Sequence, residues 1–338
     1  MASAQPELLN DLLRATSRSF YLTLRVLPGA IRPQIGLAYL LARTTDSIAD
    51  TEIVPIEQRL SALQELRERI LGPNPAKLNF GELARHQASA AEKLLLEKVE
   101  DGLAALRSFT SDDQKLVRSV LDTITSGQGL DLKRFARVNP KDTSTAPQKI
   151  IALQTEAELD DYTYRVAGCV GEFWTKMCRA HVFPKAKLDD AFLLANGVRF
   201  GKGLQLVNIL RDLPADLHKG RCYLPSEKLR EIGLTPEMLL QPANEPKLRP
   251  LYNRYLGLAE AHLSAGWNYT NSLPWRNVRV RLACAWPILI GTKTIRRLRL
   301  GNVLDPRRRI KVPRSEVRGI IFRSVLFYPL AARWRKLL

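Results

Sequence analysis

The stretch GKGLQLVNILRDLPADL (residues 201–217) decides the fold class, because its polar residues recur at helical spacing within an apolar sequence. Four of them fall at i, i+3, i+7 and i+11 and form one stripe along a helix: Gln205, Asn208, Asp212 and Asp216. The remaining faces carry leucine, isoleucine and valine, which is typical of a helix packed into a core. Pro214 removes one backbone hydrogen bond, so we expect the helix to kink or end there.

A second stretch, YLLARTTDSIAD (residues 39–50), places Asp46 and Asp50 four residues apart, so both carboxylates face one side of a helix. Tyr39 and Arg43 continue this face toward the N-terminus. A lone pair of this kind is most often part of a solvated acidic surface with arginine counter-ions. Here the flanking residues are apolar, and carboxylates in such surroundings repel one another unless a cation compensates them.

The two acidic segments therefore predict a site for a hard divalent cation. Mg²⁺ takes carboxylate, amide and water oxygens, and it bridges a few carboxylates to the phosphate groups of a substrate. We expect five residues to hold Mg²⁺ and, through it, a diphosphate: Asp46, Asp50, Asn208, Asp212 and Asp216. Three arginines would bond the phosphate oxygens directly: Arg43, Arg211 and Arg221.

Apolar residues recur at helical spacing along most of the chain, for example from Leu60 to Ile70, and no convincing β-branched alternating run is present. Turn signals such as Gly72-Pro73-Asn74-Pro75 separate the periodic segments. The sequence therefore predicts an all-α protein of roughly ten helices.

The composition excludes several classes of protein. With 338 residues, of which 45% are hydrophobic and 25% charged, the chain is not collagen-like, a disulfide scaffold or largely disordered. Its net charge of +18 indicates an anionic partner. Residues 293–338 contain 14 of the 52 lysines and arginines and only two acids, so this segment carries +12 of the total.

Targeting and metal signals are weak in this sequence. The four cysteines and four histidines do not show zinc-site spacing. The N-terminal MASAQPELLNDLL (residues 1–13) lacks the basic start and apolar stretch of a signal peptide, and no apolar run reaches the roughly 18 residues needed to span a bilayer. We therefore expect a cytoplasmic protein that associates with a membrane only peripherally.

Apolar residues and arginines alternate in the C-terminal segment RGIIFRSVLFYPLAARWRKLL (residues 318–338). This pattern suits a helix in the interface of an anionic membrane, which is the partner we expect. Clustered arginine is also typical of nucleic-acid binding. Bulky apolar residues would be unused on a duplex, so nucleic acid is not the expected partner. A third interpretation is that the segment packs on its own domain.

A third segment, DDYTYRVAGCVGEFW (residues 160–174), places Ala167, Gly168 and Gly171 in an apolar helix. Small residues allow another helix or a bulky apolar ligand to approach closely. Tyr162 precedes them, and a tyrosine near a carbocation can exchange a proton or stabilise the cation with its ring. A buried core tyrosine is the alternative interpretation.

Taken together, these segments resemble the squalene/phytoene synthase family of head-to-head prenyl transferases over about residues 10–300. Five ordered motifs carry the resemblance: SRSFYLTLRVLP (17–28), YLLARTTDSIADT (39–51), GQGLDL (127–132), LDDYTYRVAGCVGEFW (159–174) and NILRDLPADLHKGRCYLP (208–225). The last of these and RLACAWPILIG (281–291) are most similar to bacterial squalene synthases.

The resemblance implies an isoprenoid synthase fold, a single large helical bundle around a central apolar cavity. The catalytic domain would cover residues 1–292, followed by a basic amphipathic tail over residues 293–338. Two farnesyl diphosphates would condense to presqualene diphosphate, which would then be ionised, rearranged and reduced by NADPH to squalene. The NADPH dependence comes from the resemblance alone, since the sequence has no Gly-rich dinucleotide fingerprint.

Several alternatives stay open at this point. Relatives that make dehydrosqualene or phytoene finish by losing a proton, and others stop at presqualene diphosphate. The alternative from another class is a basic helical protein without catalysis that binds a membrane surface or nucleic acid. The sequence also leaves the oligomeric state and the prenyl chain length open.

The resemblance also assigns residues. Asp46 and Asp50 match the first metal-binding motif, and Asp212 and Asp216 match the second. Tyr162 matches the tyrosine with an acid/base role in the first half-reaction. The substrate-site positions are Ser17, Ser19, Phe20, Tyr39, Arg43, Gln205, Asn208, Arg211 and Arg221. Ala215 stands where many members carry Glu, which would weaken metal affinity there.

Overall fold

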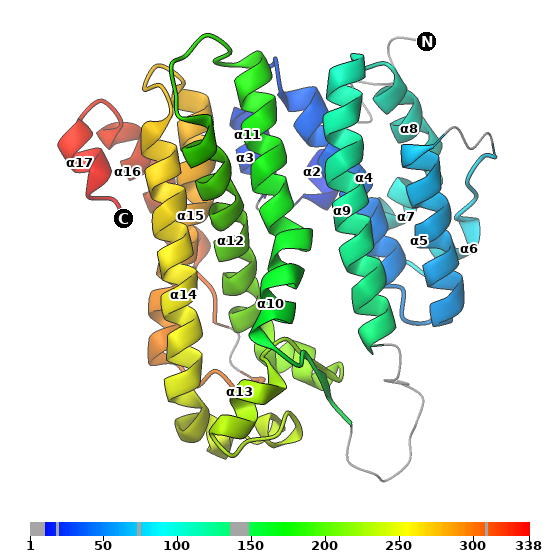
Figure 1. Cartoon of the computed structure of the whole chain (residues 1–338), viewed down its shortest axis with the longest axis vertical. Helices are drawn as coiled ribbons and strands as arrows, with labels where there is room; N and C mark the ends of the chain where they lie inside the picture. Colours follow the sequence, from blue (N-terminus) through cyan, green and yellow to red (C-terminus); the bar gives the residue numbers. More distant parts are fainter. Residues whose placement is uncertain (1–10, 18–19, 73–75, 136–148, 308–309) are drawn as a thin grey trace. The chain divides into compact units, whose positions relative to one another are not determined.

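The computed structural model describes residues 11–17, 20–72, 76–135, 149–307 and 310–338 (Figure 1). These residues form sixteen α-helices, a π-helical turn, two 3₁₀ turns and two strands of two residues each. The predicted all-α class is therefore confirmed. The number of helices exceeds the roughly ten expected, because short helices such as α2 (Leu13–Thr16) and α6 (Gly81–Arg85) contain too few residues to show a period in the sequence.

The helices group into two compact units, and each unit is described by itself. Unit 1 comprises Met1–Lys133 and Phe173–Ala186, and unit 2 comprises Arg134–Glu172 and Lys187–Leu338. Two helices contribute residues to both units: α9 (Ser111–Phe135) and α11 (Cys169–His181). The central apolar cavity stays a prediction, as does the domain boundary at residue 293.

Unit 1 is built around α4 (Arg32–Ala49), which has a proline in its first turn, where a missing N–H costs nothing. One face of α4 is buried in the core and includes Leu37, Leu41 and Ile48. The other helices of this unit are α3 (Phe20–Val26), α5 (Ile56–Leu71), α7 (Ala90–Glu97) and α8 (Val99–Arg107), together with α2, α6, most of α9 and most of α11.

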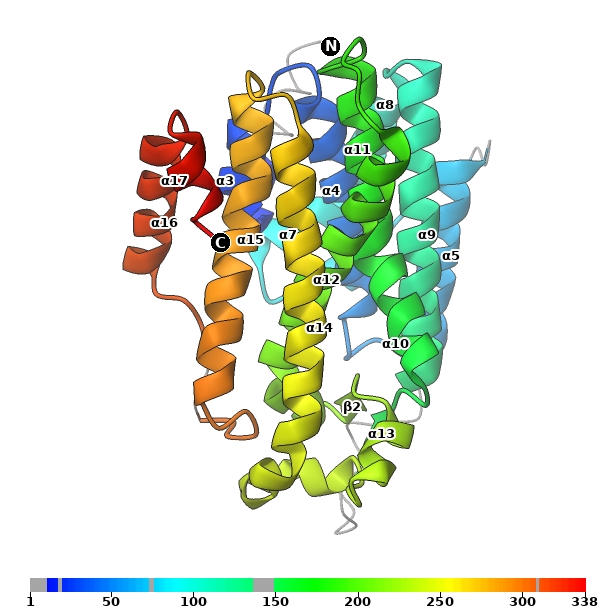
Figure 2. The same ribbon diagram turned by 60° about the vertical axis from the view of Figure 1, so that its left-hand side comes forward.

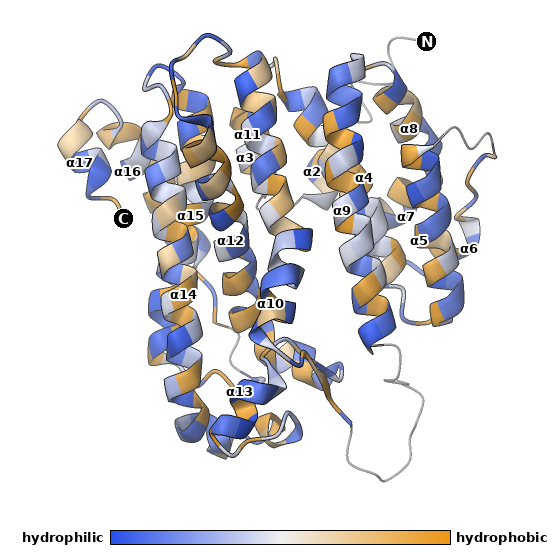
Figure 3. Cartoon of the chain, viewed as in Figure 1, coloured by the Kyte–Doolittle hydropathy of each residue, from blue (hydrophilic) through white to orange (hydrophobic). Residues whose placement is uncertain are grey.

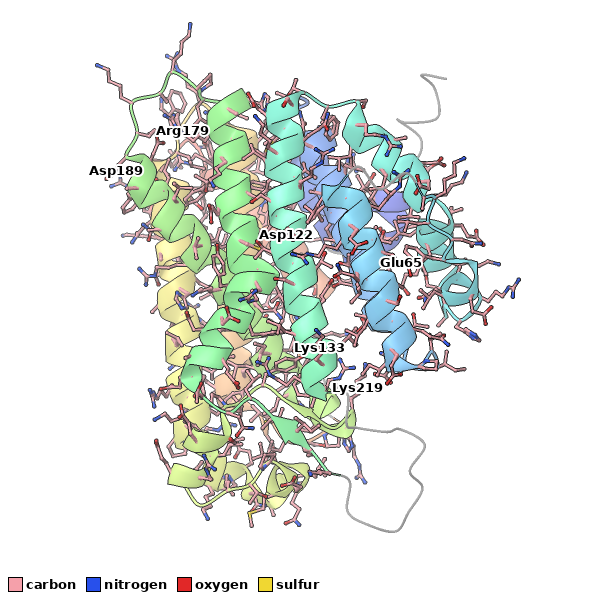
Figure 4. All side chains as sticks on the ribbon, turned by 45° about the vertical axis from the view of Figure 1, so that its right-hand side comes forward. Glu65, Asp122, Lys133, Arg179, Asp189 and Lys219 are labelled. Carbon is pink, nitrogen blue, oxygen red and sulfur yellow. The ribbon has the colours of Figure 1, made fainter. Side chains whose placement is uncertain are left out.

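Ion pairs join neighbouring helices of unit 1. Asp122 lies on α9 on the side toward α5 (Figure 4), and Arg67 of α5 donates to its Oδ1 at 2.6 Å. Arg69 of α5 donates to both carboxylate oxygens of Glu100 on α8, at 3.1 and 3.0 Å. Figure 3 shows hydrophilic and hydrophobic residues interleaved along α5, as an amphipathic helix requires.

Unit 2 contains three long helices that lie side by side in both ribbon views (Figures 1 and 2): α12 (Asp190–His218), α14 (Glu245–Ser272) and α15 (Val278–Leu300). Tyr252 of α14 is fully buried, and its hydroxyl donates to the carbonyl of Leu210 on α12 at 2.8 Å. The shorter elements are α10 (Glu156–Thr163), η2 (Tyr164–Gly168), α13 (Ser226–Glu231), η3 (Glu237–Leu240), η4 (Pro242–Asn244), α16 (Arg314–Phe327) and α17 (Ala331–Arg335).

Helix α12 begins at an N-cap, Asp189 (labelled in Figure 4), whose side chain accepts a hydrogen bond from the backbone N–H of Phe192 at 2.9 Å. Of the two outcomes expected at Pro214, an end of the helix does not occur, because α12 continues to His218, and a kink stays a prediction. Gly220 then adopts a positive φ of 74° and leads into β2 (Arg221–Cys222), which pairs in parallel with β1 (Ile151–Ala152).

The predicted close approach at the small residues is confirmed within unit 2. A Cβ added at Gly171 would collide with the backbone carbonyl of Gly197 on α12, and one added at Gly201 would collide with the carbonyl of Ala167. Glycine is therefore required on both sides of this contact. The contact includes the π-helical turn η2 (Tyr164–Gly168), and such turns are frequent at functional sites.

The C-terminal helices α16 and α17 pack on the long helices of unit 2. Trp334 is buried and stacks on Trp267 of α14, with ring centroids 5.2 Å apart. The interpretation that this segment packs on its own domain is therefore confirmed for the side that carries Trp334. In the described part of the chain, no helix combines the length and the apolar composition needed to cross a bilayer.

Candidate active site

The first acidic pair lies at the C-terminal end of α4, as predicted. Asp46 is in the last turn of the helix and Asp50 is the C-cap, whose backbone N–H donates to the Asp46 carbonyl at 2.8 Å. Asp50 is exposed, and 46% of the Asp46 side chain is exposed. Water and a hydrated cation can therefore reach both carboxylates.

Two neighbours hold the Asp46 carboxylate. Gln128 of α9 donates from Nε2 to Oδ1, and Arg43 lies one turn back on α4 with Nη1 3.6 Å from Oδ2. Gln128 is only 8% exposed, and its Oε1 is buried without a hydrogen-bond partner among the described residues. Gln128 lies within the motif GQGLDL, but no role for it was predicted, because nothing local in the sequence shows what it contacts.

Although the Asp46 side chain is half exposed, the protein atoms around its carboxyl displace part of its solvation and raise its pKa to about 6, and the charge of Asp50 acts in the same direction. Arg43 and Gln128 oppose the shift by favouring the charged form. The excess of negative charge is therefore only partly compensated by the protein. A cation bound to this pair would complete the compensation.

Arg43 is shared between two acids. Its Nη2 donates to Oε1 of Glu92 on α7, and its Nη1 faces Asp46. Burial lowers the pKa of Arg43, but the bond to Glu92 and the charge of Asp46 outweigh it, so the pKa is raised overall. Glu92 was not predicted from the sequence, since it is 49 residues away from Arg43.

Four further residues predicted for the substrate site belong to unit 1: Ser17, Ser19, Phe20 and Tyr39. The Tyr39 hydroxyl donates to the carbonyl of Thr16 at 3.3 Å, which ties α4 to α2. Ser17 is buried, and its hydroxyl donates to the Leu13 carbonyl, so this side chain is engaged with its own helix. Ser19 and the side chain of Phe20 lie outside the described residues.

The second set of polar residues lies on one helix of unit 2, as the spacing predicted. All four are half-buried on α12: Gln205, Asn208, Asp212 and Asp216. Asn208 Nδ2 donates to Gln205 Oε1 at the outer limit of 3.5 Å. The helix runs through Pro214, so Asp216 keeps its place on the stripe.

Arg211 and Asp212 form a two-point ion pair. Nε and Nη2 of Arg211 donate to the two carboxylate oxygens at 2.9 and 2.5 Å. The bond to Asp212 raises the pKa of Arg211 against the effect of burial, and the charges of Asp212 and Asp216 add to it. This cluster therefore combines two carboxylates and one guanidinium within two turns of a half-buried helix surface.

Tyr162 belongs to an aromatic cluster of unit 2. Its ring stacks on Tyr223 with centroids 4.7 Å apart, and Phe135 meets Tyr223 edge-on at 5.5 Å. The Arg221 guanidinium lies over the Phe135 ring at 5.8 Å. The structure therefore brings Tyr162 and Arg221 into one cluster and adds Phe135 and Tyr223, which were not predicted.

The donor set suits Mg²⁺ but not a closed metal cage. The described residues include no group of three or more histidine, cysteine, aspartate or glutamate side chains that could hold a metal ion by themselves. Each acidic pair instead offers two carboxylates with amide neighbours, and Mg²⁺ completes such a set with water and substrate phosphates. The first pair belongs to unit 1 and the second to unit 2, so a shared cavity stays a prediction.

Comparison with known proteins identifies the family. The family model described as squalene/phytoene synthase matches residues 13–316. The chain is 30% identical to a presqualene diphosphate synthase of Sinorhizobium fredii over 318 residues, 92% of this chain and 94% of that protein. It is 28% identical to a bifunctional lycopene cyclase/phytoene synthase of Blakeslea trispora, covering 83% of this chain but only 43% of that longer protein.

Solved structures agree on the fold. The protein TcSQS, solved with a ligand, superimposes with a TM-score of 0.76 at 22% identity, over 95% of this chain and 86% of that one. A dehydrosqualene synthase superimposes with a TM-score of 0.66 at 20% identity, over 96% of both chains. The predicted isoprenoid synthase fold is thus confirmed, and the chain belongs to the squalene/phytoene synthase family of prenyltransferases.

Proposed function

We propose that this protein condenses two farnesyl diphosphates head to head into presqualene diphosphate. The observation that carries the proposal is the repeated arrangement on α4 and α12, where two carboxylates one turn apart stand beside an arginine. Ionisation of an allylic diphosphate needs both kinds of group, because negative charge develops on the departing diphosphate.

Each set of residues takes a part in holding the diphosphates. Five residues would hold Mg²⁺: Asp46, Asp50, Asn208, Asp212 and Asp216. When bound, Mg²⁺ supplies positive charge that stabilises the leaving diphosphate. Arg43, Arg211 and Arg221 donate to phosphate oxygens. The remaining substrate positions are those assigned by resemblance: Ser17, Ser19, Phe20, Tyr39 and Gln205.

Tyr162 and its aromatic neighbours stabilise the carbocation and remove its proton. Condensation joins the two prenyl chains through a cyclopropane ring and releases one diphosphate and one proton. The stacked rings of Tyr162 and Tyr223 present π faces that stabilise a nearby cation, and the Tyr162 hydroxyl accepts or relays the departing proton. The apolar residues around these rings limit access of water to the cation.

Reduction of presqualene diphosphate to squalene by NADPH is the second candidate activity. It is supported by the resemblance of residues 208–225 and 281–291 to bacterial squalene synthases. The relative from Sinorhizobium fredii, named for presqualene diphosphate, supports the first half-reaction alone. No residue of this chain is assigned to NADPH. Loss of a proton to give dehydrosqualene or phytoene is the remaining alternative.

We also propose that the protein acts at a membrane surface. Residues 1–292 would form the catalytic domain, and the basic segment 293–338 would bring the protein to the cytoplasmic surface of an anionic membrane. The +12 charge of this segment supports the assignment. The prenyl products are apolar and partition into lipid, so release at a membrane is favourable.

A product assay tests the chemistry. Purified protein is incubated with farnesyl diphosphate and Mg²⁺, with and without NADPH, and the products are separated by chromatography. We expect presqualene diphosphate without NADPH, and squalene with NADPH only if the second activity is present. Asp212→Asn should lower diphosphate release by at least about 100-fold, whereas Asp190→Asn, at the exposed start of the same helix, should not. Consumption of geranylgeranyl diphosphate in preference to farnesyl diphosphate would contradict the proposal.

A further inference from the structure

Within unit 2, the side of α16 that carries Ser324 fastens this helix to α15. Ser324 is fully buried and accepts a hydrogen bond at 2.9 Å from Nε1 of Trp286 on α15. In the following helix, Trp334 Nε1 donates to Asn271 Oδ1 of α14 at 2.8 Å. These contacts fix the orientation of α16, so the opposite side of the helix is held away from the protein.

That outer side carries large apolar side chains in solvent. Phe322, Val325 and Leu326 are 67%, 52% and 53% exposed, and Leu330, just beyond the helix, is 47% exposed. Residues 322, 325 and 326 are spaced three and four apart, so they form one patch on the helix surface. We call these four residues the outer patch. Such a group on a soluble protein marks an interaction surface.

The charges around the outer patch are of one sign. Arg318 and Arg323 on α16 and Arg333 on α17 are all exposed. The acid of α16, Glu316, is engaged with Arg297 of α15 at 2.9 Å. The surroundings of the outer patch are therefore cationic, which fits a partner that is negatively charged at its surface and apolar beneath.

This combination selects one kind of partner. An isologous contact with a second copy would bring the arginines of both copies together, which is unfavourable. A nucleic-acid duplex would satisfy the arginines and leave the phenylalanine and leucines in contact with its polar surface. An anionic bilayer satisfies both, because arginines bind headgroup phosphates while apolar side chains enter the acyl boundary.

We infer that the outer patch of α16 is the surface by which the protein binds an anionic lipid bilayer. This inference rests on the membrane association proposed above and not on the proposed chemistry. It assigns the contact to one side of one helix, while the side that carries Ser324 stays packed against the protein. The arginines attract the membrane, and Phe322 and Leu326 insert into it.

Vesicle sedimentation with the full chain tests this assignment. The vesicles contain phosphatidylcholine alone or with 30 mol% phosphatidylglycerol, an amount of the order that gives a strongly negative surface. We expect binding to the anionic vesicles only, with affinity lowered at least about tenfold in the double variant F322S/L326S. The triple variant R318Q/R323Q/R333Q should lose the preference for anionic lipid. Leu258→Ser, at a comparably exposed leucine on α14, is the matched control and should bind as the wild type.

Two further measurements keep the outcomes distinct. Diphosphate release from farnesyl diphosphate, measured without vesicles, should be the same in all variants, so a chain that binds lipid but lacks activity overturns the proposed chemistry alone. Unchanged far-UV circular dichroism shows that the variants fold. Equal vesicle binding by F322S/L326S would overturn the inference, as would a wild-type dimer in light scattering that this variant converts to a monomer.

Discussion

Replacing Asp46 with asparagine should stabilise the metal-free protein while removing its function. Burial and the charge of Asp50 raise the pKa of the Asp46 carboxyl from 3.8 to about 6, so the folded protein carries this charge at a cost. A shift of this size corresponds to about 3 kcal/mol if taken in full. Because 46% of the side chain is exposed, solvent screening reduces the effect to about 1 kcal/mol.

The pH dependence of this effect has a definite sign. A carboxyl whose pKa is higher in the folded than in the unfolded state favours folding below pH 4, and this contribution is lost as the pH rises through about 6. Asp46→Asn carries no charge at any of these pH values. The variant should therefore match the wild type in stability near pH 4 and exceed it by about 1 kcal/mol above pH 7.

Thermal unfolding in EDTA, followed by calorimetry at pH 4 and pH 7.5, measures the difference. A gain of about 1 kcal/mol in a unit of this size raises the melting temperature by about 3 °C. Adding Mg²⁺ at pH 7.5 should reverse the order, because only the wild type binds the cation at this pair and gains stability from it. Lower stability of Asp46→Asn than of the wild type at pH 7.5 in EDTA would refute this reasoning.

Three further predictions concern contacts that only the folded chain reveals. Gln128→Leu removes the hydrogen-bond donor to Asp46 and should weaken Mn²⁺ binding by about tenfold, the usual effect of losing a partner that orients a metal ligand. Electron paramagnetic resonance measures the affinity for Mn²⁺, and an unchanged affinity would exclude a positioning role for Gln128. Glu92→Gln removes the negative charge that competes with a phosphate group for Arg43, so it should tighten the binding of inorganic diphosphate with Mg²⁺ about threefold. Isothermal titration calorimetry measures this affinity, and weaker binding would contradict the prediction. Gly201→Ala should destabilise the protein by several kcal/mol in urea unfolding, because its Cβ would meet backbone. The control Gly257→Ala, in an open stretch of α14, should raise stability by about 0.5–1 kcal/mol.

The parts of the candidate site that could be predicted from the sequence each lie on one helix. Asp46 and Asp50 share a helix end, and the residues from Gln205 to Asp216 share a helix face, because a 3.6-residue period is a local property of the chain. The same locality explains why the sequence could not decide whether the helix ends at Pro214. Proline weakens a helix locally, but the packing of α12 within unit 2 outweighs the loss of one hydrogen bond.

The partners of these residues could not be predicted in the same way. Gln128 is 82 residues from the aspartate that it contacts, and Glu92 is 49 residues from Arg43. Tyr223 reaches Tyr162 from the segment after a short strand, and Phe135 reaches Tyr223 from the end of a helix. Contacts of this kind depend on how helices pack, which leaves no periodic signal in the sequence.

The amino-acid sequence by itself determined the helical class, the two carboxylate pairs, the group of small residues at positions 167, 168 and 171, and the concentration of positive charge after residue 292. Each of these follows from composition or from spacing within one segment. Only the tertiary structure decided which neighbours hold Asp46 and Arg43, and which side of α16 is covered. The C-terminal segment is apolar on both sides, so its sequence suits either a membrane or a core, and packing against Trp286 and Asn271 commits one side to the protein and leaves the other exposed.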